Sequence, residues 1–297
     1  MKKQEILENE YLRVNISTLG KNVSILSIYN KKTGKEWIYS DKNKIKSRSA
    51  KESYDNQYFG GCEFLFPNDM PVFVMNKLFQ DHGYLWTTDY CTNGVEETEE
   101  EYIIEYTGYI ETLRIKSYVK VSLLKHSPKL CFSIILKNES ENTYPYLLRL
   151  HPSFNVTESC QLLLNGKKIH FEGDLDTSYC SFQVKMKVQD YPIIDYDLGR
   201  FSIEEIMKTN VSELFCHIVQ DDGSFTIVEG EEKIRVSYNN KDFPYITIYC
   251  INAEECIAII EPDSGLEADL KKMIENGTAE NIFPMQVKQY DVNIEVF

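Results

Sequence analysis

Apolar and polar residues alternate along most of the chain, which is typical of β-strands with one buried face. The alternation is clearest between residues 101 and 150, where two rows of apolar side chains are expected to point inward. The rows are Leu113, Ile115, Val119, Val121 and Leu123, followed by Leu130, Phe132, Ile134 and Leu136. Further strands are predicted at residues 11–16, 23–29, 214–238, 244–249, 256–261 and 286–297. Short polar turns without intervening helices predict an antiparallel meander.

Only two short helices are predicted. Ser202-Ile203-Glu204-Glu205 has the form of a capping box, which predicts a helix from Ile203 to Lys208. A second helix is predicted from Leu266 to Asn276, where Gly277 follows as a C-terminal stop.

The remaining segments are expected to be loops. Residues 41–57 are polar and show no periodicity, which predicts a surface loop, and Asp221-Asp222-Gly223-Ser224 predicts a turn. No linker or repeat interrupts the 297 residues, and large all-β sandwiches reach this length as one domain. The sequence therefore predicts a single all-β domain over residues 1–297.

One predicted strand leads from Tyr144 to His151 and meets Pro152. In an extended segment Leu147, Arg149 and His151 share one face, while Tyr146, Leu148 and Leu150 share the other. Pro152 cannot donate to a sheet, so the strand is expected to end there. A strand-end histidine suits proton chemistry, and it equally suits a hydrogen bond to a loop.

A second apolar strand ends in the same way, at Glu261-Pro262. Glu261 is in phase with Ile257 and Ile259, so its carboxylate points to an otherwise apolar face. An inward carboxylate is costly to bury without partners, which favours a functional role for Glu261. A third polar position, His82, lies in the step Asp81-His82-Gly83 and is followed by aromatic residues.

Composition narrows the possible partners. The formal net charge of −14 disfavours nucleic acids and anionic membrane surfaces, and a neutral small molecule fits it best. No apolar run is long enough to cross a membrane, and the N-terminus lacks the pattern of a secretory signal. The eight cysteines are scattered without C-x-x-C spacing, which is typical of reduced cytoplasmic thiols.

Three motifs in order resemble the aldose 1-epimerase (galactose mutarotase-like) family. His82-Gly83-Tyr84 is similar to the family's H-G-[FY] step, His151-Pro152-Ser153-Phe154-Asn155 to its H-P-x-F-N motif, and Ile260-Glu261-Pro262 to its late strand ending in E-P. The resemblance spans nearly the whole chain. It implies a large antiparallel β-sandwich with its site on one concave sheet.

The resemblance also implies the roles of the three residues. His151 is expected to be the general acid and Glu261 the general base, and His82 is expected to bind and orient the sugar. Opening a pyranose ring requires one proton placed on the ring oxygen and one removed from the anomeric hydroxyl. Such chemistry needs no metal and no cofactor.

The sequence departs from the family pattern at residues 60–69, where the family's early arginine is missing. Arg149 shares a face with His151 and is a candidate replacement as a sugar ligand, or a partner for one of the many surface carboxylates. Trp86 and Phe243 are candidates for apolar contact with the sugar ring, or are ordinary core residues. The family's P-G-E near the C-terminus is also absent, which affects the expected hydroxyl contacts more than the reaction.

Three alternatives remain at the level of the sequence. A hexose-6-phosphate epimerase of the same fold would need a phosphate site, for which the sequence offers the basic loop of Lys42, Lys44, Lys46 and Arg48. A non-catalytic carbohydrate-binding protein would keep the fold without turnover. A zinc site at His82, His151 and Glu261 lacks short ligand spacing. The oligomeric state is expected to be a monomer or homodimer.

Overall fold

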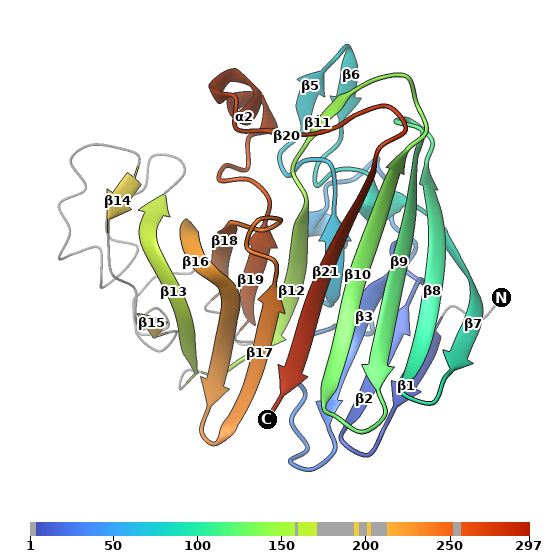
Figure 1. The fold of residues 1–297 in the computed structure, drawn as a ribbon, viewed down its shortest axis with the longest axis vertical. Helices are drawn as coiled ribbons and strands as arrows, with labels where there is room; N and C mark the ends of the chain where they lie inside the picture. The colour runs from blue at the N-terminus through green and yellow to red at the C-terminus, as the bar shows by residue number, and fades with distance from the viewer. Residues whose placement is uncertain (1–3, 158–159, 171–192, 196–200, 203–212, 252–256) are drawn as a thin grey trace.

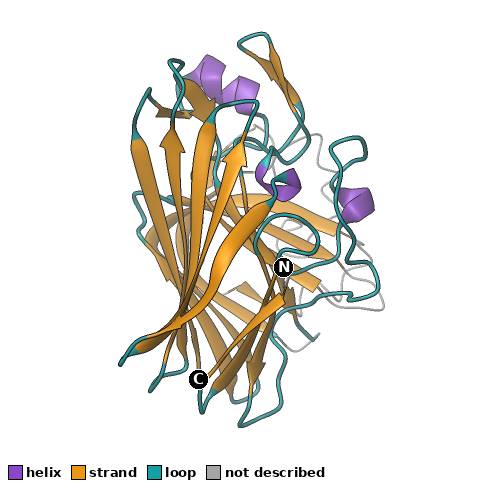
Figure 2. Ribbon diagram, turned by 90° about the vertical axis from the view of Figure 1, so that its right-hand side faces the viewer, coloured by secondary structure: helices purple, strands orange, loops and turns teal. Residues whose placement is uncertain are grey.

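A computed structural model describes residues 4–157, 160–170, 193–195, 201–202, 213–251 and 257–297 as two packed antiparallel layers (Figures 1 and 2). One layer runs in spatial order through β1 (Gln4–Glu8), β2 (Leu12–Ser17), β3 (Ser24–Asn30), β4 (Cys62–Leu65), β12 (Arg149–Asn155), β19 (Ile257–Asp263), β18 (Tyr245–Ile251), the first half of β16 (Glu213–Glu229) and β13 (Gln161–His170), with β14 (Ile193–Asp195) and β15 (Phe201–Ser202) beside β13. The other contains β7 (Tyr90–Glu97), β8 (Glu101–Ile110), β9 (Ile115–Leu124), β10 (Lys129–Asn138), β21 (Val287–Val296), β17 (Glu232–Tyr238) and the second half of β16. The predicted all-β antiparallel sandwich is confirmed.

Two small antiparallel sheets lie at one end of the sandwich (Figure 1). They pair β5 (Val72–Val74) with β6 (Lys77–Phe79) and β11 (Tyr144–Tyr146) with β20 (Glu280–Ile282). Short 3₁₀ helices cover Asp55–Gln57 and Leu85–Thr87.

The strand β16 joins the two layers. Its first half pairs with β18 and its second half, from Ser224, pairs with β17. The predicted turn at Asp221–Ser224 is therefore wrong, because the strand continues through it. Gly223 lies at the change of partner with a φ of +63°, where an added Cβ would lie 2.5 Å from the Tyr238 carbonyl oxygen. The glycine permits a bend inside the strand instead of a turn at its end.

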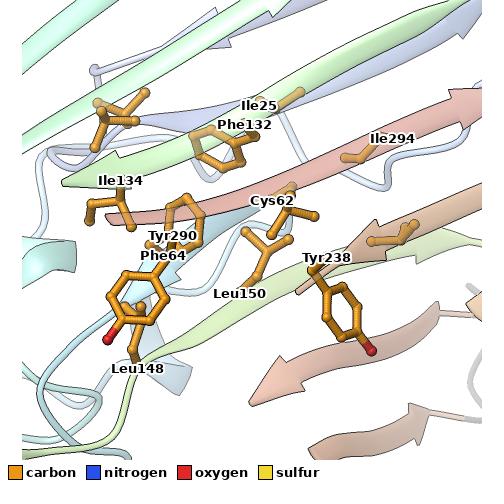
Figure 3. Close-up of a cluster of buried hydrophobic side chains, with 14 of the residues drawn as sticks. Ile25, Cys62, Phe64, Phe132, Ile134, Leu148, Leu150, Tyr238, Tyr290 and Ile294 are labelled. Atoms are coloured by element: carbon orange, nitrogen blue, oxygen red, sulfur yellow. The ribbon is translucent and has the colours of Figure 1, made fainter. Parts of the chain in front are cut away.

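The core lies between the two layers, and Figure 3 shows part of it. Phe64 of β4 packs on Phe132 of β10 with ring centroids 4.7 Å apart, and Leu150 of β12 points into the same cluster. The two predicted apolar rows of β9 and β10 are buried, as expected. Because side chains alternate along a strand, the odd-numbered residues of β12 point out of the sandwich core.

The helix α2 (Leu270–Asn276) confirms one of the two helix predictions. It begins later than expected because Asp269 acts as its N-cap, accepting hydrogen bonds from the main-chain nitrogens of Lys271 and Lys272. It ends at Gly277, whose left-handed conformation has a φ of 71°. The helix predicted at residues 203–208 lies outside the described residues. No described helix is both long and apolar enough for a membrane span.

The segment 41–57 is not the simple surface loop that its composition predicts. Arg48 and Tyr54 are each only 1% exposed, because they fold over the outer face of the layer that contains β4 and β12. In Figure 2, loops and short helices cover the outer side of this layer. The covering loops convert an exposed sheet face into a partly enclosed site.

Candidate active site

Strand register brings His151 and Glu261 side by side. Strands β12 and β19 pair with Arg149 opposite Asp263, and two residues along each strand His151 faces Glu261. Residues directly opposite in an antiparallel pair place their side chains on the same face. The Nε2 atom of His151 lies 3.1 Å from Oε1 of Glu261, and the two residues are 7% and 3% exposed.

The two strands do not end at these residues, contrary to the sequence-based prediction. β12 continues through Pro152 to Asn155, and β19 continues through Pro262 to Asp263. The ladder pairs between β12 and β19 are instead interrupted between Arg149 and Ser153. Since proline has no N–H, each proline removes a possible ladder hydrogen bond in that stretch. The histidine–glutamate pair thus lies inside the sheet, at a gap in its ladder.

Arg149 lies at the centre of a carboxylate cluster. Its Nη1 atom is 2.9 Å from Oδ2 of Asp69 and 3.0 Å from Oε2 of Glu261, and its Nη2 atom is 2.7 Å from Oδ2 of Asp263. The contact with Glu261 is an ion pair without hydrogen-bond geometry. Arg149 also lines the cavity, so its role as a sugar ligand stays a prediction.

Replacing Arg149 with methionine is expected to destabilise the protein by about 3–5 kcal/mol, because buried carboxylates lose their shared counter-charge. The free energy of unfolding in urea measures this. Arg13→Met on the exposed face of β2 is the matched control. A loss below about 1 kcal/mol would show that Arg149 does not hold this cluster together. In the same variant, an unchanged Michaelis constant would argue against Arg149 as a sugar ligand.

His82 is fixed by two carboxylates and by its own backbone. Its Nδ1 atom lies 2.7 Å from Oδ1 of Asp81, and its Nε2 atom lies 3.1 Å from Oδ1 of Asp69. Burial lowers the pKa of His82, but the charges of Asp69 and Asp81 outweigh it and hold that pKa above its ordinary value. His82 has a φ of +55°, which is uncommon for a non-glycine residue. Gly83 is required next to it, because an added Cβ would lie 2.1 Å from the Phe66 carbonyl oxygen.

Burial shifts the pKa values of Glu261 and His151 in opposite directions. It raises the pKa of Glu261 to about 8, with Asp69 adding to the rise and Arg149 opposing it. It lowers the pKa of His151 to about 3, and the charges of His82 and Arg149 lower it further. Near neutral pH the pair therefore carries one proton. Because the groups are coupled, that proton belongs to the pair rather than to one residue.

These side chains open into a cavity of about 620 Å³, a size typical of small-molecule sites. The polar lining comes from Asp55, Asp69, Asp81, His82, Arg149, His151 and Glu261. The aromatic and apolar lining comes from Tyr54, Tyr58, Met70, Pro71, Tyr249 and Ile259. The cavity lining therefore combines hydrogen-bonding groups with aromatic and apolar side chains.

Trp86 and Phe243 do not reach this cavity, which corrects the prediction that they contact a sugar ring. Both are fully buried. Trp86 donates from Nε1 to the Asp81 carbonyl oxygen at 2.8 Å and packs edge-on against Tyr54. Phe243 lies in the sandwich core, with ring centroids 5.5 Å from Tyr290.

Sequence reasoning missed several residues of the site. Asp263 had a usable signal, since it lies two residues after Glu261 on the same strand face. Tyr54 and Tyr58 had none, because they belong to a loop whose path no periodicity predicts. Asp69 likewise lies in a loop and reaches the site through the fold alone.

The zinc alternative is not supported by the arrangement of side chains. Within the described part of the chain, no group of three or more His, Cys, Asp or Glu residues is placed to hold a metal ion. Both ring nitrogens of His82 already face carboxylates.

Solved structures of similar architecture are known. One is a galactose mutarotase-like protein from Lactobacillus casei, with a TM-score of 0.67 and 15% identity, covering 99% of this chain and 100% of that one. Another, from Clostridium acetobutylicum, has a TM-score of 0.70 and 11% identity, covering 98% and 94%. A galactose mutarotase related enzyme from Lactobacillus acidophilus has a TM-score of 0.65 and 15% identity, covering 99% and 97%.

The chain has the galactose mutarotase-like fold. At these identities the similarity concerns the fold alone. No family model matches the sequence, and no curated protein matches it either. Any activity therefore has to be argued from the site itself.

Proposed function

We propose that this protein is an aldose 1-epimerase that interconverts the α and β anomers of a free or lightly modified hexose. The observation that carries the proposal is the contact between His151 and Glu261, 3.1 Å apart within a cavity of small-molecule size. The ring oxygen and the anomeric hydroxyl oxygen of a pyranose are bonded to the same carbon. An acid and a base that serve both oxygens must therefore lie next to each other, as these two do.

The reaction needs two coordinated proton transfers. One group protonates the ring oxygen while the other takes the proton from the anomeric hydroxyl, so the bond between C1 and the ring oxygen breaks and C1 becomes an aldehyde. Rotation about the C1–C2 bond then presents the other face of the aldehyde. Closure reverses both transfers and returns the proton to its starting group. Each transfer contributes about 10²–10⁴-fold to the rate.

The pair carries the single proton that this cycle requires. In the assignment that follows from the motifs, His151 is the acid and Glu261 is the base. The opposite shifts of their pKa values favour the proton on Glu261 before substrate binds. A transfer across the 3.1 Å contact produces the other form, and both forms hold one proton.

The cavity suits a neutral sugar better than a sugar phosphate. The guanidinium group in the cavity lining is that of Arg149, and it already faces three carboxylates. Arg48, one of the four cations of the basic-loop alternative, is buried against Glu63. The carboxylates of Asp55 and Asp81 add further negative charge to the lining. A phosphate would be repelled there unless it displaced these contacts.

Polarimetry tests the proposal. Freshly dissolved α-glucose and α-galactose should reach anomeric equilibrium faster with the protein than in buffer. Glucose 6-phosphate, compared in the same assay, should be converted more slowly than glucose. Mutarotation no faster than the buffer rate across a broad panel of free sugars would refute the proposal.

The pH dependence of kcat/KM should follow the titration of the proton that His151 and Glu261 share. Above about pH 8 Glu261 loses that proton, so kcat/KM is expected to fall about tenfold per pH unit there. Between pH 5 and 7.5 it should change little, because the lowered pKa of His151 keeps the second proton off. Rates corrected for buffer catalysis between pH 5 and 10 measure this. A steady fall from pH 7.5 to 5 would show that an imidazole of the site, His151 or His82, gains a proton in this range and slows the reaction.

A further inference from the structure

A buried ion pair lies behind the candidate site, and the proposed reaction does not use it. Nη1 of Arg48 donates to both carboxylate oxygens of Glu63, at 2.7 and 2.8 Å, and both residues are 1% exposed. Glu63 lies opposite His151 in the pairing of β4 with β12. It also accepts hydrogen bonds from the Tyr54 hydroxyl at 2.8 Å and from Nδ2 of Asn22 at 3.2 Å.

The ring of Tyr54 touches both histidines of the site. It stacks on the His82 imidazole with centroids 4.2 Å apart and planes inclined by 13°. Its contact with the His151 imidazole is edge-to-face, with centroids 5.6 Å apart and planes at 77°. The two imidazoles are 6.4 Å apart, so the phenol ring is a common neighbour of both.

The main chain of Tyr54 makes a second link to His82. Its backbone N–H donates to Oδ2 of Asp81 at 2.8 Å, and Oδ1 of the same carboxylate lies 2.7 Å from Nδ1 of His82. The opposite end of Tyr54 is held by its hydroxyl bond to Glu63. The residue is therefore anchored at both ends, with its ring between the anchors.

We propose that Tyr54 is a positioning residue that fixes the orientation of His82 and His151, and that the Arg48–Glu63 ion pair holds Tyr54 in place. Replacing a buried ion pair with apolar side chains is often neutral or stabilising, so stability alone gives a weak reason for Arg48 and Glu63. Positioning explains the ion pair better. Arg48 holds the Glu63 carboxylate at a fixed position, and this charged acceptor determines where the hydroxyl of Tyr54 must lie. The kinetic part of this inference depends on the proposed function, whereas the placement of the histidines does not.

The test uses two substitutions at Tyr54 and one matched control. Tyr54→Phe keeps the ring and removes the bond to Glu63, and Tyr54→Leu also removes the ring. Tyr90→Phe is the control, because it removes a comparable buried hydroxyl bond, to Ser117 at 2.7 Å, outside the site.

The first measurement is NMR of the imidazole resonances in the resting protein at constant pH. The chain has five histidines, and the variants His82→Gln and His151→Gln assign the two that matter. In Tyr54→Leu the His82 ring resonances should move downfield, since the shielding by a stacked ring is lost. In Tyr54→Phe the resonances of both histidines should shift or broaden, while Tyr90→Phe leaves them unchanged.

The second measurement is mutarotation. Tyr54→Phe is expected to lower kcat about 3- to 10-fold, the size of one lost hydrogen bond, while Tyr90→Phe stays within twofold of wild type. Histidine spectra that match wild type in both Tyr54 variants would overturn the inference, and if Tyr54→Leu does not fold, Tyr54→Phe decides it. Altered spectra without any mutarotation by the wild-type protein would refute the proposed function and leave the positioning role supported.

Discussion

Glu261→Gln should abolish nearly all of the proposed mutarotase activity, lowering kcat by about 10²–10⁴-fold. Glutamine keeps the shape of the side chain and both of its polar atoms, but the amide neither accepts nor releases a proton during the reaction. The pair that His151 forms with Glu261 would then lack one of its two titrating members. Stopped-flow or conventional polarimetry on α-glucose measures the loss.

Turnover by the wild-type protein, rather than sugar affinity, separates this expectation from its main competitor. In an enzyme, Glu261→Gln should bind sugar nearly as well as wild type while turning it over slowly. In a non-catalytic carbohydrate-binding protein, affinity would likewise persist, but the wild type would show no turnover to lose. Glu105→Gln on the exposed face of β8 is the matched control and should retain full activity. Wild-type rates in Glu261→Gln would remove this residue from the mechanism.

His151→Gln is expected to have an effect of similar size, about 10²–10⁴-fold in kcat. The amide nitrogen of glutamine takes the approximate place of Nε2, the atom that faces Glu261, so the substitution removes proton transfer with little change in shape. His126→Gln, at an exposed turn between β9 and β10, serves as the control.

The double variant Glu261→Gln/His151→Gln tests whether the two residues act as a unit. Residues that share one proton lose most of their function when either is removed, so the double variant should be only slightly slower than each single variant. If the rate loss of the double variant equals the product of the two single losses, the two groups act independently of each other.

The sequence predicted the β-sandwich well because strands with one buried face show alternating apolar and polar residues. One buried face per strand is enough to predict rows such as Phe132 and Ile134, and these are buried as expected. The common outward face of Arg149 and His151 followed from the same rule. The helix end at Gly277 was predictable because a left-handed C-cap has a strong residue preference.

The surroundings of the site were less predictable because they depend on pairing between distant segments. Nothing local to Arg149 indicates that it meets Asp69, which is 80 residues away in the chain. Arg48 looked like one of several surface charges, and only the fold places it against Glu63. The ring of Trp86 makes it a candidate for sugar contact from the sequence alone, whereas its position behind Tyr54 depends on the path of two loops.

The burial of His151 and Glu261 has a thermodynamic consequence for the whole fold. The raised pKa of Glu261 lowers the stability of the native state as pH rises from 4.5, its ordinary value, toward about 8. The lowered pKa of His151 reduces stability as pH falls from 6.5, its ordinary value, toward about 3. Between about pH 4.5 and 6.5 the two pH dependences have opposite signs and offset each other, so the combined cost of burying the pair is constant and smallest in that window.

The double variant Glu261→Gln/His151→Gln should therefore melt at a higher temperature than wild type above about pH 6.5 and below about pH 4.5. The gap should be smallest between these values, and melting curves from pH 3 to 9 measure it. A constant gap at every pH would mean that burial does not shift the two groups. If the gap varies as expected, the protein gives up some thermal stability to keep a proton at the cavity.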